Sequence, residues 1–250
     1  MKIAYWAMFH GQTKSTTNML LIHIYAALKS DVKQLIISNQ FSYNLIEEYL
    51  GIEKDKNTSL DNLLTALRNK TLRHDYFLDY TESLMKNQAL DIITESIHSH
   101  RTVPKNIEEL FVGVTEIADK IYKNVVTDVN AGLTDFNKCI LDSSDLIIVN
   151  LNQNKYAVKE TIKEIRRLNY ESKVKYIVGD YIEATRLTKR NMERTYKIAI
   201  EGVIPHNKNI MNATNSGNLL DFVNQNLDVQ EHDENYYLFS QLNNISKHFR

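Results

Sequence analysis

The chain has 250 residues, of which 43% are hydrophobic and 24% are charged, as in an ordinary soluble globular protein. This length is enough for one large domain with a sizeable core. The formal net charge of −1 excludes a global field that would pull the chain onto nucleic acid or an anionic membrane, so either contact would need a local patch.

Cysteine content and apolar patterning indicate a compartment. The single cysteine, Cys139, excludes an internal disulfide and fits a reducing environment. No apolar run reaches the roughly 20 residues that span a bilayer. Residues 1–11 lack the apolar length and cleavage site of a signal peptide, and we expect a β-strand there. The chain is therefore expected to be cytoplasmic.

Apolar, β-branched or aromatic runs alternate with helical patterns along the chain. The expected strands are Lys2–Met8, Val32–Ser38, Ala89–Thr94, Asn124–Asp128, Leu146–Leu151, Val174–Gly179 and Lys197–Val203. The expected helices are Ser15–Leu28, Leu60–Arg68, Ile107–Tyr122, Val158–Leu168, Ile182–Arg194 and Tyr236–His248. This alternation predicts an α/β fold, a doubly wound and mostly parallel sheet with helices on both faces. We expect a single domain over residues 1–250 with a helical elaboration at about 51–87.

The first strand leads through a short loop into an apolar helix, the context that a phosphate-binding loop requires. Lys14 supplies a cation for phosphate oxygens, and Ser15 and Thr16 place hydroxyls at the start of the helix. The helix N-terminus adds free N–H groups and a partial positive charge. The plainer interpretation is that Ser15, Thr16 and Thr17 only cap the helix. With Gly11 as its one glycine, the loop alone does not decide between the two.

Aligned on Lys14, the segment 9–16 resembles the deviant Walker A loop of the ParA/MinD family, K-G-G-x-G-K-[ST]-[ST]. The family's signature lysine falls on Phe9, and two of its glycines fall on His10 and Thr13.

Later motifs occur in the family's order. Residues 125–133 resemble the Walker B strand, which ends in Asp128, and residues 145–150 resemble the strand after it. Asp180 follows another strand, where the family often carries an asparagine that reads adenine. Residues 202–205, ending in Pro205, resemble the segment beside the nucleotide base. The resemblance extends from Lys2 to about Asn226.

This resemblance implies a P-loop ATPase fold that binds ATP or ADP with Mg²⁺. The implied cofactor-binding residues are Gly11, Gln12, Thr13, Lys14, Ser15, Thr16, Asp180 and Pro205. Ser15 and Asp128 are the implied metal ligands, with Asp128 acting through water. The implied role is a homodimeric, bacterial-type switch that positions cellular machinery and is held at a pole or membrane through a protein partner. The altered loop also resembles the TadZ/CpaE-like branch of pilus assembly.

Two departures from the family pattern bear on turnover. Residues 38–41 stand where the family has an acidic segment, and neither Ser38 nor Gln40 can act as a carboxylate base. Gln40 can orient a water molecule by hydrogen bonding, as glutamine does in some GTPases. Phe9 cannot stabilise phosphates across a dimer, and the β-branched Thr13 resists positive φ. We expect nucleotide binding with very slow hydrolysis, and no residue is assigned as a certain catalytic group.

Two weaker patterns favour structural interpretations. His98 and His100, beside Arg101, suggest a metal pair, but two such histidines without a nearby carboxylate favour a solvated loop. The basic residues of the predicted helix Ile182–Arg194 resemble the DNA-binding surfaces of ParA relatives. Glu183 and the near-zero net charge favour a solvated helix face, so DNA is not expected as a partner.

The last predicted helix carries apolar residues at helical spacing, namely Leu238, Leu242, Ile245 and Phe249. It resembles the membrane tail of MinD, although its polar face of asparagine and serine favours a closing helix packed on the sheet.

Three functions therefore compete. They are a slow or degenerate ATPase switch, a pseudo-ATPase scaffold that acts only through protein contacts, and a DNA-partition ATPase.

Overall fold

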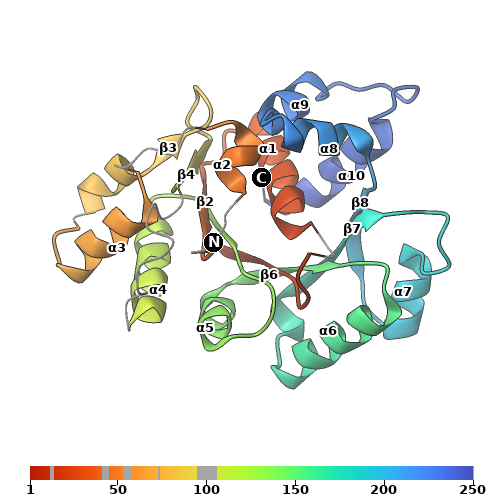
Figure 1. Cartoon of the computed structure of the whole chain (residues 1–250), viewed down its shortest axis with the longest axis horizontal. Helices are drawn as coiled ribbons and strands as arrows, with labels where there is room; N and C mark the ends of the chain where they lie inside the picture. Colours follow the sequence, from red (N-terminus) through yellow and green to blue (C-terminus); the bar gives the residue numbers. More distant parts are fainter. Residues whose placement is uncertain (12–13, 41–44, 53–57, 73, 95–105, 250) are drawn as a thin grey trace.

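The computed structural model describes residues 1–11, 14–40, 45–52, 58–72, 74–94 and 106–249. Its described residues form one eight-stranded sheet in the order β3-β4-β2-β5-β1-β6-β7-β8 (Figure 1). The strands are β1 Lys2–Trp6, β2 Gln34–Ser38, β3 Glu82–Ser83, β4 Leu90–Ile92, β5 Asn124–Asp128, β6 Leu146–Leu151, β7 Val174–Tyr181 and β8 Ile200–Pro205. Every neighbouring pair in the sheet is parallel except β3 and β4.

Helices follow most strands. They are α1 Ser15–Lys29, α2 Ile46–Leu50, α3 Leu60–Arg68, α4 Ile107–Ala118, α5 Asp135–Ser143, α6 Lys155–Arg167, α7 Lys189–Tyr196, α8 Lys208–Asn215, α9 Leu219–Gln225 and α10 Tyr236–Ser246. Two 3₁₀ helices, His74–Tyr80 and Glu171–Lys173, complete the described elements.

The central strands bury both faces, because successive side chains point to opposite sides of a sheet. Ala4 and Trp6 of β1 pack in the core beneath α3, α4, α5, α6 and α7. Ile3 and Tyr5 of the same strand pack in a second core beneath α1, α2, α8, α9 and α10. Figure 1 shows these two helical layers on either side of the sheet. The predicted α/β fold, doubly wound and mostly parallel, is confirmed.

The predicted helix Ile182–Arg194 is wrong in its first half. Residues 182–188 form turns, and α7 begins at Lys189 after Thr188, whose hydroxyl accepts the N–H of Asn191. The side chain of Gln153 holds this turn region: its amide nitrogen donates to the Ile182 carbonyl at 3.0 Å, and its oxygen accepts the Ile182 N–H at 2.7 Å. Arg186 therefore lies outside the helix, which shortens the basic face expected there.

The final helix packs inward. Its apolar residues, Leu238, Leu242 and Ile245, are buried in the second core together with Phe249. β8 carries Gly202 beneath it, where an added Cβ would lie 2.6 Å from Cγ1 of Ile245, so the glycine permits the close approach of α10. Among the described residues, we find no helix with the length and apolar character of a membrane span.

Candidate functional site

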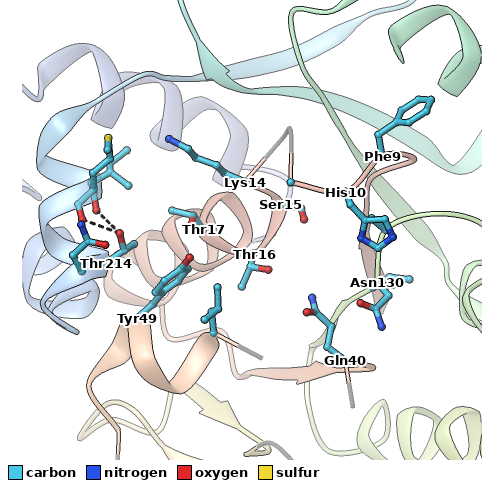
Figure 2. A pocket seen from close by; sticks show the side chains of 17 residues that line it. Phe9, His10, Lys14, Ser15, Thr16, Thr17, Gln40, Tyr49, Asn130 and Thr214 are labelled. Carbon is cyan, nitrogen blue, oxygen red and sulfur yellow. Dashed lines mark hydrogen bonds between the residues drawn. The ribbon is translucent and has the colours of Figure 1, made fainter. Parts of the chain in front are cut away.

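A cavity of about 420 Å³ opens at the carboxyl ends of the central strands (Figure 2). Its walls come from the start of α1, from α2, from the segments after β1, β2 and β5, and from α8. The residues that line it are Phe9, His10, Gly11, Lys14, Ser15, Thr16, Thr17, Gln40, Leu45, Tyr49, Val129, Asn130, Ala131, Ile210, Met211, Thr214 and Asn215. This is the edge at which an open parallel sheet binds its ligands.

Asp128 lies behind the polar wall of the cavity. The Thr16 hydroxyl donates to its Oδ2 at 2.7 Å, and the amide nitrogen of Gln40 donates to the same oxygen at 3.1 Å. The carboxyl group comes from the end of β5, Thr16 from the first turn of α1, and Gln40 from the segment after β2. Three elements thus converge on one carboxylate because parallel strands end at the same edge.

The Asp128 carboxyl is fully buried. Burial raises its pKa to about 7, although the hydrogen bonds from Thr16 and Gln40 act in the opposite direction. Its Oδ1 has no hydrogen-bond partner among the described residues. A buried carboxylate oxygen without a donor, next to hydroxyls at a helix start, is chemistry that suits a hydrated Mg²⁺. The residues present therefore fit the metal that the sequence implies.

Lys14 occupies the N-cap position of α1 with a left-handed backbone, φ 50° and ψ 44°. Its ammonium group does not point to the centre of the cavity. It lies 2.9 Å from Oδ1 of Asp180, at the end of β7, and the same oxygen lies 2.8 Å from Nδ1 of His206. Partial burial raises the pKa of the Asp180 carboxyl, but these two partners outweigh it and hold that pKa below its usual value.

Asparagine side chains fasten the segment after β5. Asn39 donates to the side-chain oxygen of Asn137 at 2.9 Å and accepts the Asn130 N–H at 2.7 Å. Asn137 donates in turn to the carbonyls of Asn130 and Gly132. The indole of Trp6 also donates to the Gly132 carbonyl, at 2.7 Å. These contacts fix the cavity wall that contains residues 129–131.

The opposite wall is less polar. Tyr49 of α2 hydrogen-bonds Thr17, and burial is the main reason that the pKa of its hydroxyl is raised. Ile210 and Met211 of α8 complete this side. At the other end of the cavity the ring of Phe9 points outward and is 36% exposed (Figure 2).

The structure brings most of the predicted site residues together. Gly11, Lys14, Ser15, Thr16 and Gln40 all line the cavity, and Asp128 lies directly behind them. Thr16, rather than Ser15, is the hydroxyl that contacts Asp128.

Other predicted residues lie apart from the cavity or outside the description. Asp180 and Pro205 are absent from the cavity wall, and Asp180 is connected to it through Lys14. Gln12, Thr13, His98, His100 and Arg101 lie outside the described residues. Within the described ranges, no group of three or more histidine, cysteine or acidic side chains gathers as a metal cluster.

Sequence reasoning missed several contributors. Tyr49 and the α8 residues of the cavity wall were not predicted as site residues, and Asn130 lay within the Walker B-like segment without being assigned a role. The role of Asn137 had one usable signal, because Thr134 precedes it by three residues in an N-cap pattern and does accept its N–H.

Comparison with known proteins identifies the architecture. Neither the protein-family models nor the curated protein sequences give a match to this chain. Among solved structures, a ParA family ATPase from Chlorobium tepidum superposes with a TM-score of 0.78 at 14% identity, covering 99% of both chains. MinD in the MinC:MinD cell division protein complex of Aquifex aeolicus gives 0.73 at 16% identity, covering 99% of this chain and 95% of the other.

The septum site-determining protein MinD from Pyrococcus horikoshii, complexed with Mg-ADP, gives a TM-score of 0.72 at 16% identity and covers 99% of this chain and 96% of that one. Similarity at this level of identity establishes the fold. The chain therefore has the ParA/MinD-like P-loop ATPase fold along nearly its whole length.

Proposed function

We propose that this chain binds Mg-ADP or Mg-ATP at the cavity and acts as a nucleotide-dependent switch with very slow hydrolysis. The observation that carries the proposal is the convergence of Thr16 and Gln40 on the buried Asp128 beside the cavity at the start of α1. The MinD neighbour was solved with Mg-ADP, which supports this ligand class.

Phosphate oxygens would be held by the first turn of α1. The leading N–H groups of a helix have no partner within the helix, and they carry a partial positive charge. No acidic residue stands in the first turn of α1 to oppose an anion. The Ser15 hydroxyl adds a donor on the same wall. The Lys14 ammonium, which pairs with Asp180, would have to leave that carboxylate to reach a phosphate.

Magnesium would lie between the phosphates and Asp128. Ser15 supplies a hydroxyl on the cavity wall, and Asp128 would reach the ion through water because Thr16 and Gln40 separate it from the cavity. When bound, the ion neutralises phosphate charge. The nucleotide base would extend past Lys14 towards Pro205 and Asp180.

Slow hydrolysis is proposed because the site lacks the signature lysine and the acidic pair of the family pattern. Phe9 replaces a cation, and Ser38 and Gln40 replace carboxylates. Gln40 lines the cavity and is in position to orient a water molecule, but it is not a base. Phosphoryl transfer depends on positioning and charge stabilisation, and the loss of one electrostatic donor typically raises the barrier by about 3 kcal/mol.

A protein that dwells in one nucleotide state would serve as a persistent mark of position. We propose that it forms a homodimer through the loop face that carries Phe9 and recruits a protein partner, as MinD is found with MinC in the Aquifex complex. The altered phosphate loop is the feature that favours a pilus or secretion apparatus as the cargo.

Titration calorimetry with Mg-ADP and Mg-ATP tests the binding. Replacing Lys14 by Ala should weaken affinity severalfold, because it removes a charge-assisted contact with phosphate. Lys155→Ala, at the exposed start of α6, is the matched control and should bind like the wild type. If neither the wild type nor the control binds at millimolar nucleotide, the switch fails, and a pseudo-ATPase scaffold takes its place.

A further inference from the structure

Lys14 and Asp180 form an ion pair at the edge of the cavity. The ammonium nitrogen lies 2.9 Å from Oδ1 of Asp180, and the two residues are 166 positions apart in the sequence. Nδ1 of His206, just after β8, lies 2.8 Å from the same oxygen. Lys14 and His206 thus share one oxygen of this carboxylate, and they are the basic side chains that the described residues bring to it.

The pair turns the lysine away from the cavity centre. Figure 2 shows the amine of Lys14 directed away from Thr16 and Gln40, although its stem lines the cavity. Asp180 is not part of the cavity wall. An anion between Lys14 and Thr16 would therefore meet hydroxyls and helix N–H groups, while the ammonium charge remains engaged outside.

The backbone of both partners matches this arrangement. Lys14 has φ 50° and Asp180 has φ 51°, in the left-handed region that residues with a Cβ seldom adopt. Lys14 stands just before the first residue of α1. A change to right-handed dihedrals would add Lys14 to the first turn of α1 and redirect its side chain.

We propose that Asp180 is a latch that competes with phosphate for Lys14 and so sets the affinity of the site for nucleotide. The inference rests on the proposed function, because the phosphate belongs to the nucleotide bound there. When phosphate takes the ammonium, Asp180 keeps its hydrogen bond to His206. A latch of this kind keeps the empty protein free of weakly bound anions and makes binding conditional on a ligand strong enough to open it.

Asp180→Asn is the variant that tests the competition, because it keeps the shape and an acceptor for His206 but removes the charge. Calorimetry with Mg-ADP, and with magnesium pyrophosphate, which has no base for the new asparagine to contact, should show affinity roughly three- to tenfold higher than that of the wild type, since an ion pair this exposed contributes little more. The matched control is Glu201→Gln, which removes the partner of Lys175 in an ion pair of 2.8 Å far from the cavity and should change nothing. Equal or weaker binding by Asp180→Asn would overturn the latch.

A second measurement works without nucleotide binding. A zero-length carbodiimide joins ammonium and carboxylate groups that already touch, so linked peptides report both the Lys14–Asp180 pair and the Lys175–Glu201 reference pair. Millimolar pyrophosphate should lower the ratio of the first product to the second at least threefold, whereas sodium chloride of equal ionic strength should not. If pyrophosphate leaves this product ratio unchanged, the latch proposal is wrong.

The two measurements separate the two proposals. Binding of nucleotide by both proteins, tighter for Asp180→Asn than for the wild type, supports the latch and the switch together. Absence of nucleotide binding in both proteins, with the pyrophosphate effect present, removes the nucleotide switch and leaves Asp180 as a gate for phosphate anions.

Discussion

The side-chain amide of Asn39 donates to the side-chain oxygen of Asn137 across 2.9 Å, joining the segment after β2 to the first turn of α5. Asn137 in turn satisfies the carbonyls of Asn130 and Gly132. One asparagine therefore supports a whole wall of the cavity, and its side chain is buried.

Asn137→Ala should lower the free energy of unfolding by about 3 kcal/mol, because it leaves buried polar groups without partners. Urea denaturation measures the change. Asn224→Ala, on the exposed face of α9, is the control and should stay within about 0.5 kcal/mol of the wild type. A comparable loss of unfolding free energy in both variants would show that the hydrogen bonds of Asn137 do not stabilise the fold more than an exposed asparagine does.

His23 predicts a loss of stability in acid. It is fully buried between Tyr5 and Phe249, and burial lowers its pKa to about 4, against the effect of its hydrogen bond to the side-chain oxygen of Gln34. The unfolded chain takes up this proton near pH 6.5, whereas the folded chain does so only near pH 4, so stability falls across that window as the pH decreases.

The wild type should therefore lose about 3 kcal/mol relative to His23→Leu between about pH 7 and pH 4. Taking the difference in unfolding free energy between the two proteins at each pH cancels the contributions of the other titrating groups. A difference that stays constant over this range would contradict a neutral, buried imidazole.

Asp128 should give stability the opposite pH dependence to that given by His23. Its pKa of about 7 in the folded chain lies above the value near 4 of an unfolded aspartate, so the folded state favours the protonated carboxyl. Its contribution to stability is complete below pH 4 and is lost as the pH rises to 7. Without divalent cations, Asp128→Asn should thus gain about 4 kcal/mol over the wild type across this interval. Thermal unfolding in EDTA checks the trend, and a gap that narrows with rising pH would refute it.

Turnover is predicted to be very slow. Steady-state phosphate release by the wild type should be near background, and Phe9→Lys should raise it by about tenfold or more, because a cation then reaches the transferring group. Phe9→Leu keeps the position apolar and should remain as slow as the wild type. Robust release by the wild type, matching an active ParA/MinD protein assayed beside it, would require another catalytic residue.

Gly51 and Gly217 predict a steric effect at a backbone contact. Both have positive φ, and a Cβ added to Gly51 would lie 2.6 Å from the Gly217 carbonyl oxygen. Gly51→Ala should lower stability by about 3 kcal/mol, combining left-handed strain with a clash. Gly132→Ala shares the positive φ but meets open space, so it should lose only about 1 kcal/mol. Equal losses in the two variants would show that the contact adds nothing.

Much of the fold was predictable because buried parallel strands are apolar nearly throughout. Strands β5 and β6 were both predicted to the residue. β6 is apolar except for Asn150, and β5 is marked by the β-branched residues Val125, Val126 and Thr127. Short helices such as α8 were missed, because eight residues rich in asparagine show little apolar periodicity. The helix predicted from Ile182 failed because a distant side chain, Gln153, binds the segment as turns.

The site was predictable only in part for the same reason. The positions of Lys14 and Asp128 follow from a loop and a strand end, which are local features. That Lys14 pairs with Asp180, or that Thr16 reaches Asp128 in place of Ser15, depends on side-chain directions across elements far apart in the sequence. The spacing of residues in the sequence does not predict these two contacts.

The contact between Gly51 and Gly217 joins two helices that line the cavity, α2 and α8. Gly51 ends α2, the helix of Tyr49, and Gly217 lies in the turn after α8, the helix of Met211. Main chain touches main chain there, with no side chain between to yield. A ligand that displaces Tyr49 would therefore displace α8 as well, so the two helices would move together. Because α9 follows α8 directly, this movement would be transmitted to the outer surface of the molecule.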